Sequence, residues 1–283
     1  MSSAPLIAGF PLRTAADLQA ENVKIQVTGP PKTGKSSSIA RAYTTYNEQK
    51  VITGYRIFYV VIGDATALDP LLIQTIDGKR VKTGVTPAHV LLDAKSLPKQ
   101  YGNRISNAFW GIANWLTQYY ASTPKDKRLW DAVAIDGINF LGAAINDEFE
   151  ANGPRGWEKW SKIEEFFCSD LILWATGLGR GVPHSLEVFF IGHSSDPTFR
   201  DDGKVLTRGG ALLPTKKISE QFPGKCDIVL RADSVKVPGV DVAERTLFTA
   251  PDPEWVAGDR FNLCAPREPL DMAEIIRRLH AAR

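Results

Sequence analysis

The chain has little cysteine and no long apolar run. Its three cysteines, Cys168, Cys226 and Cys264, are too far apart for the spacing of a metal site. An odd, scattered set of thiols predicts small buried side chains in a reducing compartment. No stretch approaches the roughly 20 apolar residues that span a bilayer, and the first residues lack a basic segment followed by an apolar one. We therefore expect a soluble, cytoplasmic protein with no membrane partner.

The chain also lacks a strong excess of one charge. Lysine and arginine number 34, aspartate and glutamate 32, and the formal net charge is +2. The whole molecule therefore cannot bind nucleic acid simply as a polycation, and any nucleic-acid surface must be a local patch. With 43% hydrophobic and 23% charged residues, the 283-residue chain can bury a sizeable core and is not expected to be disordered.

Apolar segments alternate with segments of helical periodicity. Strands are expected at 23–27, 56–62, 90–93, 132–136 and 187–193, and helices at 36–49, 105–120, 138–150 and 157–178. A short helix at 14–20 is a further expectation, and a segment rich in Gly, Asp, Thr and Lys follows the second strand at 77–87. Near-continuous apolar strands that alternate with helices predict an α/β fold, with a mostly parallel sheet and helices on both faces.

The last third has a different pattern. Short candidate strands at 227–231, 235–237, 245–249 and 261–263 are separated by proline and glycine, which predicts antiparallel additions at the C-terminal edge of the sheet. Met272, Ile275, Ile276 and Leu279 have the spacing of one helical face. We divide the chain into a lead-in (1–22), an α/β core (23–265) and a C-terminal helix (266–283).

One motif is specific. The segment Gly29-Pro30-Pro31-Lys32-Thr33-Gly34-Lys35-Ser36-Ser37 contains the G-x-x-x-x-G-K-S spacing, directly after an expected strand and before an expected helix. Glycines let the loop wrap closely around phosphates with its amide hydrogens pointing inward. The lysine then contacts the terminal phosphates and the first serine hydroxyl binds Mg²⁺. We predict that Gly29 to Ser37 bind a nucleotide, with ATP and Mg²⁺ as cofactors.

A second carboxylate is needed to hold the magnesium ion. Asp136 ends the apolar strand Ala132–Ile135 and is the best candidate for this Walker B role, so that Ser36 and Asp136 form the predicted metal site. The alternative is an ordinary strand-end aspartate that caps the following helix.

Several short segments resemble RecA recombinases. Ile62-Gly63-Asp64-Ala65-Thr66-Ala67-Leu68-Asp69-Pro70 resembles the segment after their second core strand, and Ala134-Ile135-Asp136-Gly137 resembles their Walker B strand. Phe189-Phe190-Ile191-Gly192-His193 is similar to the strand whose terminal polar residue senses the γ-phosphate, and Gly209-Gly210 to the glycine pair after a DNA-binding loop.

The chain also resembles the short phage ATPases with a bare RecA core that act as single-strand annealing proteins. Besides the phosphate loop, Asp136 and His193, the likeness rests on Pro-Gly-Lys with Asp-Ile-Val-Leu-Arg (223–231) and a late Gly-Asp-Arg (258–260). It covers roughly 23–265, and only the phosphate loop is specific. The resemblance implies an ATPase that binds single-stranded DNA and promotes annealing or recombination as a homo-oligomeric ring or filament. It also implies a host-cytoplasmic location for a viral chain, and a single-stranded-DNA-binding protein as a further partner.

The predicted catalytic residues are Lys35, Asp64, Asp136, His193 and Arg260. RecA proteins have a catalytic glutamate where this chain has Ala65, and the carboxylate here is one position earlier, at Asp64. Either Asp64 orients the attacking water or hydrolysis is slow; a solvated turn aspartate is the alternative. Arg260 resembles an arginine finger that enters the neighbouring active site, with a surface ion pair as the alternative.

His193 has two interpretations. After an apolar strand, a neutral imidazole could sense the γ-phosphate and relay its loss to 194–208. The alternative is a strand-end histidine with satisfied hydrogen bonds.

DNA contacts are predicted in two places. The segment 194–212 contains Phe199, Arg200, Lys204 and Arg208, and Lys216 and Lys217 follow it. Its three cations are balanced by Asp196, Asp201 and Asp202, so it is a poor electrostatic trap, and a solvated loop is the alternative. In the segment 152–157, Arg155 could meet a phosphate and Trp157 a base, although such a tryptophan is often a packing anchor.

Three other classes remain open. A hexameric helicase motor would need a partner domain for which the chain has little room. A small-molecule kinase usually has an arginine-rich lid, which is not evident here. A regulatory switch ATPase with no role on DNA fits the near-neutral charge.

Overall fold

The structure is a computed structural model that describes residues 6–7, 10–11, 22–63, 66–76, 79–178, 186–235 and 243–282. Asp64 and the helix expected at 14–20 lie outside the described residues. At the N-terminus, β1 (Leu6–Ile7) and β2 (Phe10–Pro11) form an antiparallel pair. Within the described ranges, no helix combines the length and apolar character that crossing a bilayer requires.

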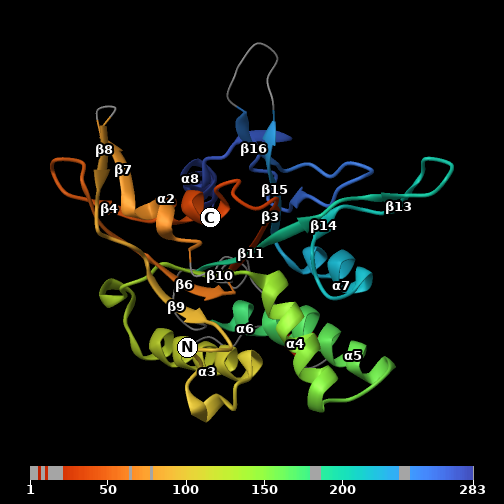
Figure 1. The fold of residues 1–283 in the computed structure, drawn as a ribbon. Coiled ribbons are helices and arrows are strands. Elements are labelled where there is room, and N and C mark those ends of the chain that lie inside the picture. The colour runs from red at the N-terminus through yellow and green to blue at the C-terminus, as the bar shows by residue number, and fades with distance from the viewer. Residues whose placement is uncertain are drawn as a thin grey trace.

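The centre of the molecule is a sheet with the strand order β18-β16-β15-β3-β11-β10-β6-β9 (Figure 1). Six neighbouring strands are parallel: β15 (Ile228–Val235), β3 (Val23–Gly29), β11 (Glu187–Ser195), β10 (Ala132–Asp136), β6 (Ile57–Ile62) and β9 (Ala88–Leu92). The antiparallel strands are β16 (Glu244–Phe248), β18 (Arg267–Pro269), β17 (Gly258–Asp259) and β14 (Gly210–Ala211). The predicted α/β class, with a mostly parallel sheet and antiparallel edge strands, is confirmed.

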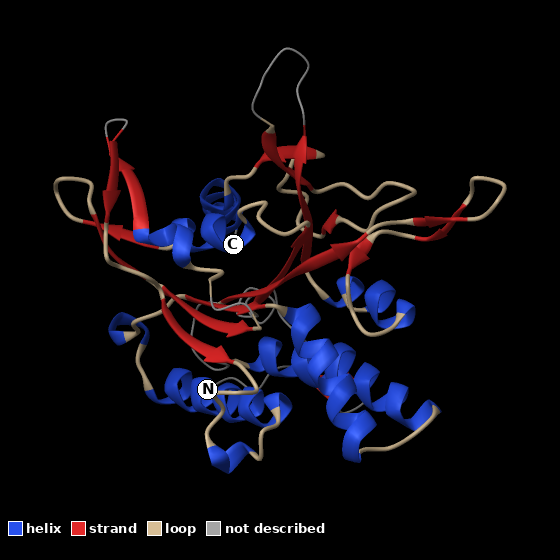
Figure 2. Cartoon of the chain, viewed as in Figure 1, coloured by secondary structure: helices blue, strands red, loops and turns tan. Residues whose placement is uncertain are grey.

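Helices cover both faces of this sheet, as Figure 2 shows. On one face pack α2 (Lys35–Ala42) and α8 (Met272–Ala282). On the other lie α3 (Ile105–Ser122), α4 (Ile138–Asn152), α5 (Trp157–Glu165), α6 (Leu171–Gly177) and α7 (Lys216–Gln221). Successive side chains of β6 enter opposite cores, because a strand alternates its faces: Phe58 lies in one cluster and Tyr59 in the other. This double burial explains the near-continuous apolar strands.

Short helical turns complete the connections. They are η1 (Asp69–Leu72), η2 (Lys99–Tyr101), η3 (Lys125–Lys127), η5 (Pro223–Lys225) and the π-helical turn η4 (Phe166–Asp170), which joins α5 to α6. The helix predicted at 157–178 is thus one helical run with a wider turn in its middle.

The helix predicted at 36–49 is wrong in its second half. The helix ends at Ala42, and a hairpin of β4 (Thr44–Tyr46) and β5 (Ile52–Tyr55) follows. β-Branched and aromatic residues favour the strand. The Asn47 side chain accepts the backbone N–H groups of Gln49 and Val51 at 3.0 and 2.9 Å and closes the turn.

Other boundaries also differ. The segment 77–87, to which the sequence assigned no element, contains β8 (Lys79–Lys82), which pairs with β7 (Ile73–Ile76). The segment 227–231 is not an antiparallel addition, because β15 runs parallel to β3 with Ile228 opposite Ile25. The strand expected at 261–263 is instead a turn, in which the Asp259 carboxylate accepts the backbone N–H groups of Phe261, Leu263 and Cys264. All three cysteines are free thiols; Cys226 is buried as predicted, whereas Cys168 and Cys264 are only half-buried.

Candidate functional site

The predicted phosphate loop joins the end of β3 to the start of α2. Gly34 has a φ of 91°, a left-handed conformation that favours glycine, and Lys32 has a φ of 63°. A Cβ on Gly29 would come within 2.1 Å of the Ala232 carbonyl oxygen, so that only glycine allows β15 to approach here. The loop therefore leads directly into the N-terminus of α2, where unpaired amides and the helix dipole favour an anion.

Lys35 lies folded into this loop. Its ammonium donates to the carbonyl oxygens of Gly29 (3.0 Å) and Pro30 (2.8 Å) and reaches Thr33 Oγ1 at 3.4 Å. Burial lowers the pKa of Lys35 to about 8, against the opposing attraction of Asp136. A desolvated ammonium ringed by oxygen acceptors is a site where phosphate oxygens can replace the backbone carbonyls and restore the charge balance.

The side chains of Ser36, in the first turn of α2, and Asp136, at the end of β10, are in contact. The Ser36 hydroxyl donates to Asp136 Oδ2 at 2.5 Å, a charge-assisted hydrogen bond, although the two residues are 100 positions apart. The Tyr59 hydroxyl donates to the Ser36 carbonyl oxygen at 2.8 Å and fixes the first turn of α2. The structure thus brings together the two predicted magnesium ligands. Hydroxyl and carboxylate oxygens are hard ligands that suit Mg²⁺. Among the described residues, no group of three or more His, Cys, Asp or Glu side chains forms another metal site.

His193 lies on the neighbouring strand at the same end of the sheet. In the β11–β3 ladder it is opposite Gly29, the first residue of the phosphate loop. Asn139 Oδ1 accepts the His193 backbone N–H at 3.1 Å, and the Phe140 ring meets the imidazole edge to face at 5.4 Å. The carboxyl ends of β3, β10 and β11 therefore present Lys35, Ser36, Asp136 and His193 together.

Arg245 is a further residue at this site, and it was missed from the sequence. A Cβ on Gly34 would lie 2.9 Å from Arg245 Nη1, so the guanidinium rests against the phosphate loop. Arg245 is exposed on β16 and has no ion pair within the described part of the chain. No motif marks it, because it comes from an antiparallel strand that pairs with β15.

Arg260 lies elsewhere in the subunit. Its Nη1 donates to Asp227 Oδ1 at 2.9 Å, and Asp227 also pairs with Lys24 at 2.9 Å. Asp227 and Lys24 are at the amino ends of β15 and β3, whereas the phosphate loop is at the carboxyl end of β3. The arginine-finger role across a subunit interface stays a prediction, and it would require this ion pair to open.

The segment expected as a polar loop is a projecting hairpin. β12 (Thr198–Phe199) pairs with β13 (Val205–Thr207), and β14 pairs with the end of β11; the hairpin extends to the right in Figure 1. Phe199 and Arg200 are exposed, while Lys204 pairs with Asp202 at 3.3 Å. Arg208 and Glu220 both line an open hollow of about 570 Å³ at the base of the hairpin.

The two lysines after the hairpin have partners. Lys216 donates to the Leu206 carbonyl oxygen at 2.7 Å, and Lys217 pairs with Glu164 at 2.8 Å. At the other predicted DNA loop, Arg155 is exposed, and Trp157 is 81% exposed, so it is not a packing anchor.

Comparisons with known proteins show a weak likeness at the level of solved structures. No family model matches the sequence, and no curated protein matches it. Among solved structures, the flagellar accessory protein FlaH from Methanocaldococcus jannaschii aligns over 81% of this chain and 78% of its own. The identity is 12% and the TM-score is 0.38. A likeness of this size carries no argument about function, so the site is interpreted from its own geometry.

Proposed function

We propose that this chain is a RecA-type ATPase that binds and hydrolyses ATP with Mg²⁺, binds single-stranded DNA, and promotes annealing or recombination as an oligomer. The observation that carries the ATPase assignment is the convergence of Lys35, Ser36 and Asp136 on one loop. The loop has the spacing, the left-handed Gly34 and the helix N-terminus that phosphate binding requires.

Each residue has a distinct task in this proposal. Lys35 exchanges its carbonyl partners for the terminal phosphates, while Ser36 and Asp136 hold Mg²⁺, which neutralises charge on the phosphates when bound. Asp136 is already aligned by the Ser36 hydroxyl, so the ligands need little rearrangement. Asp64 orients the attacking water, and slow turnover is the expectation if it does not.

The link to DNA follows the chain from His193. The Leu212 backbone N–H donates to the His193 carbonyl oxygen at 2.9 Å, which ties the base of the projecting hairpin to the strand end beside the phosphate loop. A histidine that senses the γ-phosphate could therefore reposition Phe199, Arg200 and Arg208. Oligomerisation would place Arg260 near a neighbouring site and let many weak DNA contacts act together.

Phosphate release with and without single-stranded DNA tests this proposal. We expect Mg²⁺-dependent turnover in the wild-type protein that single-stranded DNA stimulates, with a larger particle in the presence of an ATP analogue. Turnover without DNA stimulation, and no DNA binding at low salt in any nucleotide state, would leave a regulatory ATPase. Turnover that is indifferent to Mg²⁺ would contradict the assignment of Ser36 and Asp136.

A further inference from the structure

The stretch 79–128 has an unusual charge. It contains nine lysines and arginines and only two acidic residues, Asp93 and Asp126, which gives a net of +7 in a chain whose total is +2. The rest of the chain therefore has a net of −5. Protein surfaces normally intersperse both signs, so a local excess of this size calls for an anionic partner.

Most of these cations are exposed and unpaired. Seven of them, which we call the basic edge, come from three short segments: β8, the turns after β9, and the turn before β10. None makes an ion pair with any residue that the structure describes. They are Lys79, Arg80 and Lys82; Lys95 and Lys99; and Lys125 and Lys127. The nearby Asp131 carboxylate is already held by Arg56 at 2.5 and 2.8 Å and does not neutralise them.

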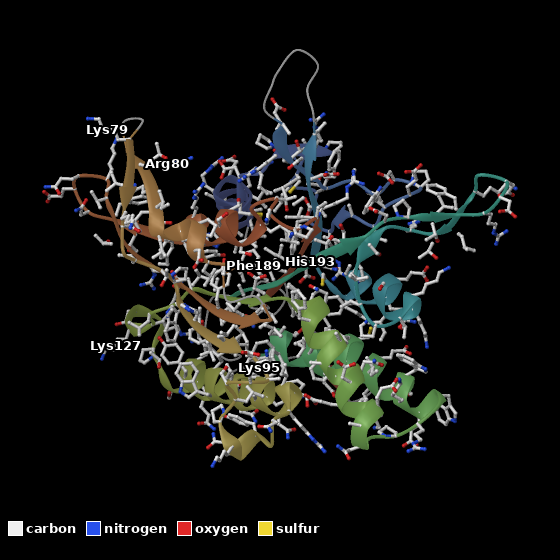
Figure 3. The ribbon with its side chains drawn as sticks, viewed as in Figure 1. Lys79, Arg80, Lys95, Lys127, Phe189 and His193 are labelled. Atoms are coloured by element: carbon white, nitrogen blue, oxygen red, sulfur yellow. The ribbon has the colours of Figure 1, made fainter. Side chains whose placement is uncertain are left out.

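The fold arranges these segments around one strand. β9 is the last strand in the sheet order, and it pairs only with β6 among the described strands. The segment after β8 leads into the amino end of β9, and Lys95 and Lys99 follow the carboxyl end of β9. Figure 3 shows Lys79 and Arg80 at the end of β8, Lys127 lower on the same side of the molecule, and Lys95 nearer the middle of the view. The five residues of β9 contain no lysine or arginine and span roughly 17 Å, so the cations form groups before, beside and after this strand that one extended single strand could connect.

Exposed aromatic surface lies near one of these groups, Lys125 and Lys127, since the Leu129 backbone N–H donates to the Tyr119 hydroxyl at 2.6 Å. Trp115 on α3 is 46% exposed and stacks on Tyr119, with ring centroids 5.8 Å apart. Trp130, three residues after Lys127, lies 6.0 Å from Trp115, and both rings contact Phe58 at the start of β6. An aromatic ring next to a line of cations is the arrangement that binds single strands, because bases stack while phosphates meet the charges.

We infer that the basic edge is a binding surface for single-stranded nucleic acid, separate from the projecting hairpin and the 152–157 loop. The inference rests on the DNA-binding part of the proposed function and moves its main electrostatic contact to β8, β9 and the turn before β10. Trp115 supplies stacking. We favour a single strand over an acidic membrane or an acidic protein because it is the partner in the proposed function and because exposed rings can stack on its bases.

A matched set of variants tests this inference by fluorescence anisotropy of a labelled single strand across salt. The edge variant is Lys79→Gln/Arg80→Gln/Lys82→Gln. Its control, Lys162→Gln/Arg267→Gln/Arg277→Gln, removes three exposed cations that are paired with Glu165, Glu244 and Glu274. Both variants change the net charge equally. A third variant, Arg200→Gln/Lys204→Gln/Arg208→Gln, alters the projecting hairpin.

We expect the edge variant to bind about tenfold more weakly at moderate salt and to lose about 2 from the slope of log affinity against log salt, roughly 0.7 for each phosphate contact. The control should match the wild type. Trp115→Leu should weaken binding with an unchanged slope, because stacking releases no counterions.

Four outcomes would overturn the inference. Equal losses in the edge and control variants would mean that only net charge matters. A loss confined to the hairpin variant would contradict the basic edge and leave the proposed function intact, whereas no binding by the wild type would remove both. Tighter binding to phosphatidylserine-containing vesicles or to inorganic polyphosphate than to the single strand would assign the surface to another anion.

Discussion

The cations of the stretch 79–128 differ from those of the C-terminal half in what they contact. Most of the described lysines and arginines in the C-terminal half have a carboxylate or carbonyl partner: Lys217 pairs with Glu164, Arg260 with Asp227, and Arg278 with Glu268. In the stretch 79–128 the exposed cations have none among the described residues. Paired cations stabilise the fold, and a neighbouring group already balances their charge. Unpaired cations remain available to bind a ligand. We therefore expect substitutions of paired groups to lower stability, and substitutions of unpaired cations to weaken ligand binding.

The largest expected effect on stability comes from a buried paired site. Asp227 is buried and is bonded by the Lys24 ammonium, the Lys24 backbone N–H and Arg260. Asp227→Ala would leave Lys24 buried without a counter-charge, and we expect a loss of about 3–5 kcal/mol in the free energy of unfolding. Urea denaturation measures it. Arg260→Ala is the control, because its exposed pair should contribute about 1 kcal/mol or less.

Asp136 has a hydrogen-bond partner, the Ser36 hydroxyl, and is also predicted to act in catalysis. Asp136→Asn keeps a hydrogen-bond acceptor for Ser36 but removes the charge that would hold Mg²⁺. We expect turnover at saturating Mg²⁺ to fall by about 10–100-fold, while ATP binding without metal changes little. Phosphate release with a parallel binding assay separates the two. Normal turnover would make Asp136 a structural partner of Ser36 only.

Arg245 tests the idea that unpaired cations serve ligands. It rests against Gly34 and has no ion pair within the described ranges. We expect Arg245→Gln to weaken ATP binding about tenfold, equivalent to one lost charge-assisted contact, and adenosine binding far less. Calorimetry with both ligands gives the ratio. Equal losses for both would place Arg245 against the base or ribose rather than the phosphates.

A single substitution on the basic edge should have the smallest effect. Lys127→Gln should alter unfolding free energy by less than about 0.5 kcal/mol, because Lys127 is exposed and unpaired. It should still reduce the salt slope of single-strand binding by about 0.7. A measurable loss of stability without any change in the salt slope would mean that Lys127 stabilises the fold and does not contact the single strand.

Features marked by residue spacing or periodicity can be predicted from the sequence, whereas contacts that depend on long-range packing cannot. The phosphate loop, Asp136 and the alternation of strands and helices follow from spacing and periodicity, and the structure contains them. The pairing of Ser36 with Asp136, 100 positions apart, was expected because the phosphate loop needs a second carboxylate at the end of an apolar strand to hold magnesium. Arg245 could not be found, since its place depends on the pairing of β16 with β15.

For other elements, predictions based on local composition gave the wrong boundary or the wrong strand direction. Good helix formers at 36–42 concealed the hairpin that begins at Thr44, where β-branched and aromatic residues favour strand. The parallel direction of β15 depends on long-range packing against β3 and has no local signature. The basic edge was not predicted from the sequence, although a charge count over 79–128 differs from the count over the whole chain and could have indicated it.

The most direct test of the central claim is calorimetric titration of ATP into the wild-type protein and into Lys35→Ala. Lys35 is the buried cation at the centre of the loop, with its ammonium already surrounded by oxygen acceptors. We predict saturable binding to the wild type, no measurable binding to Lys35→Ala, and unchanged circular dichroism between the two. Equal affinity of both proteins for ATP would contradict the assignment of residues 29–37 as a phosphate site.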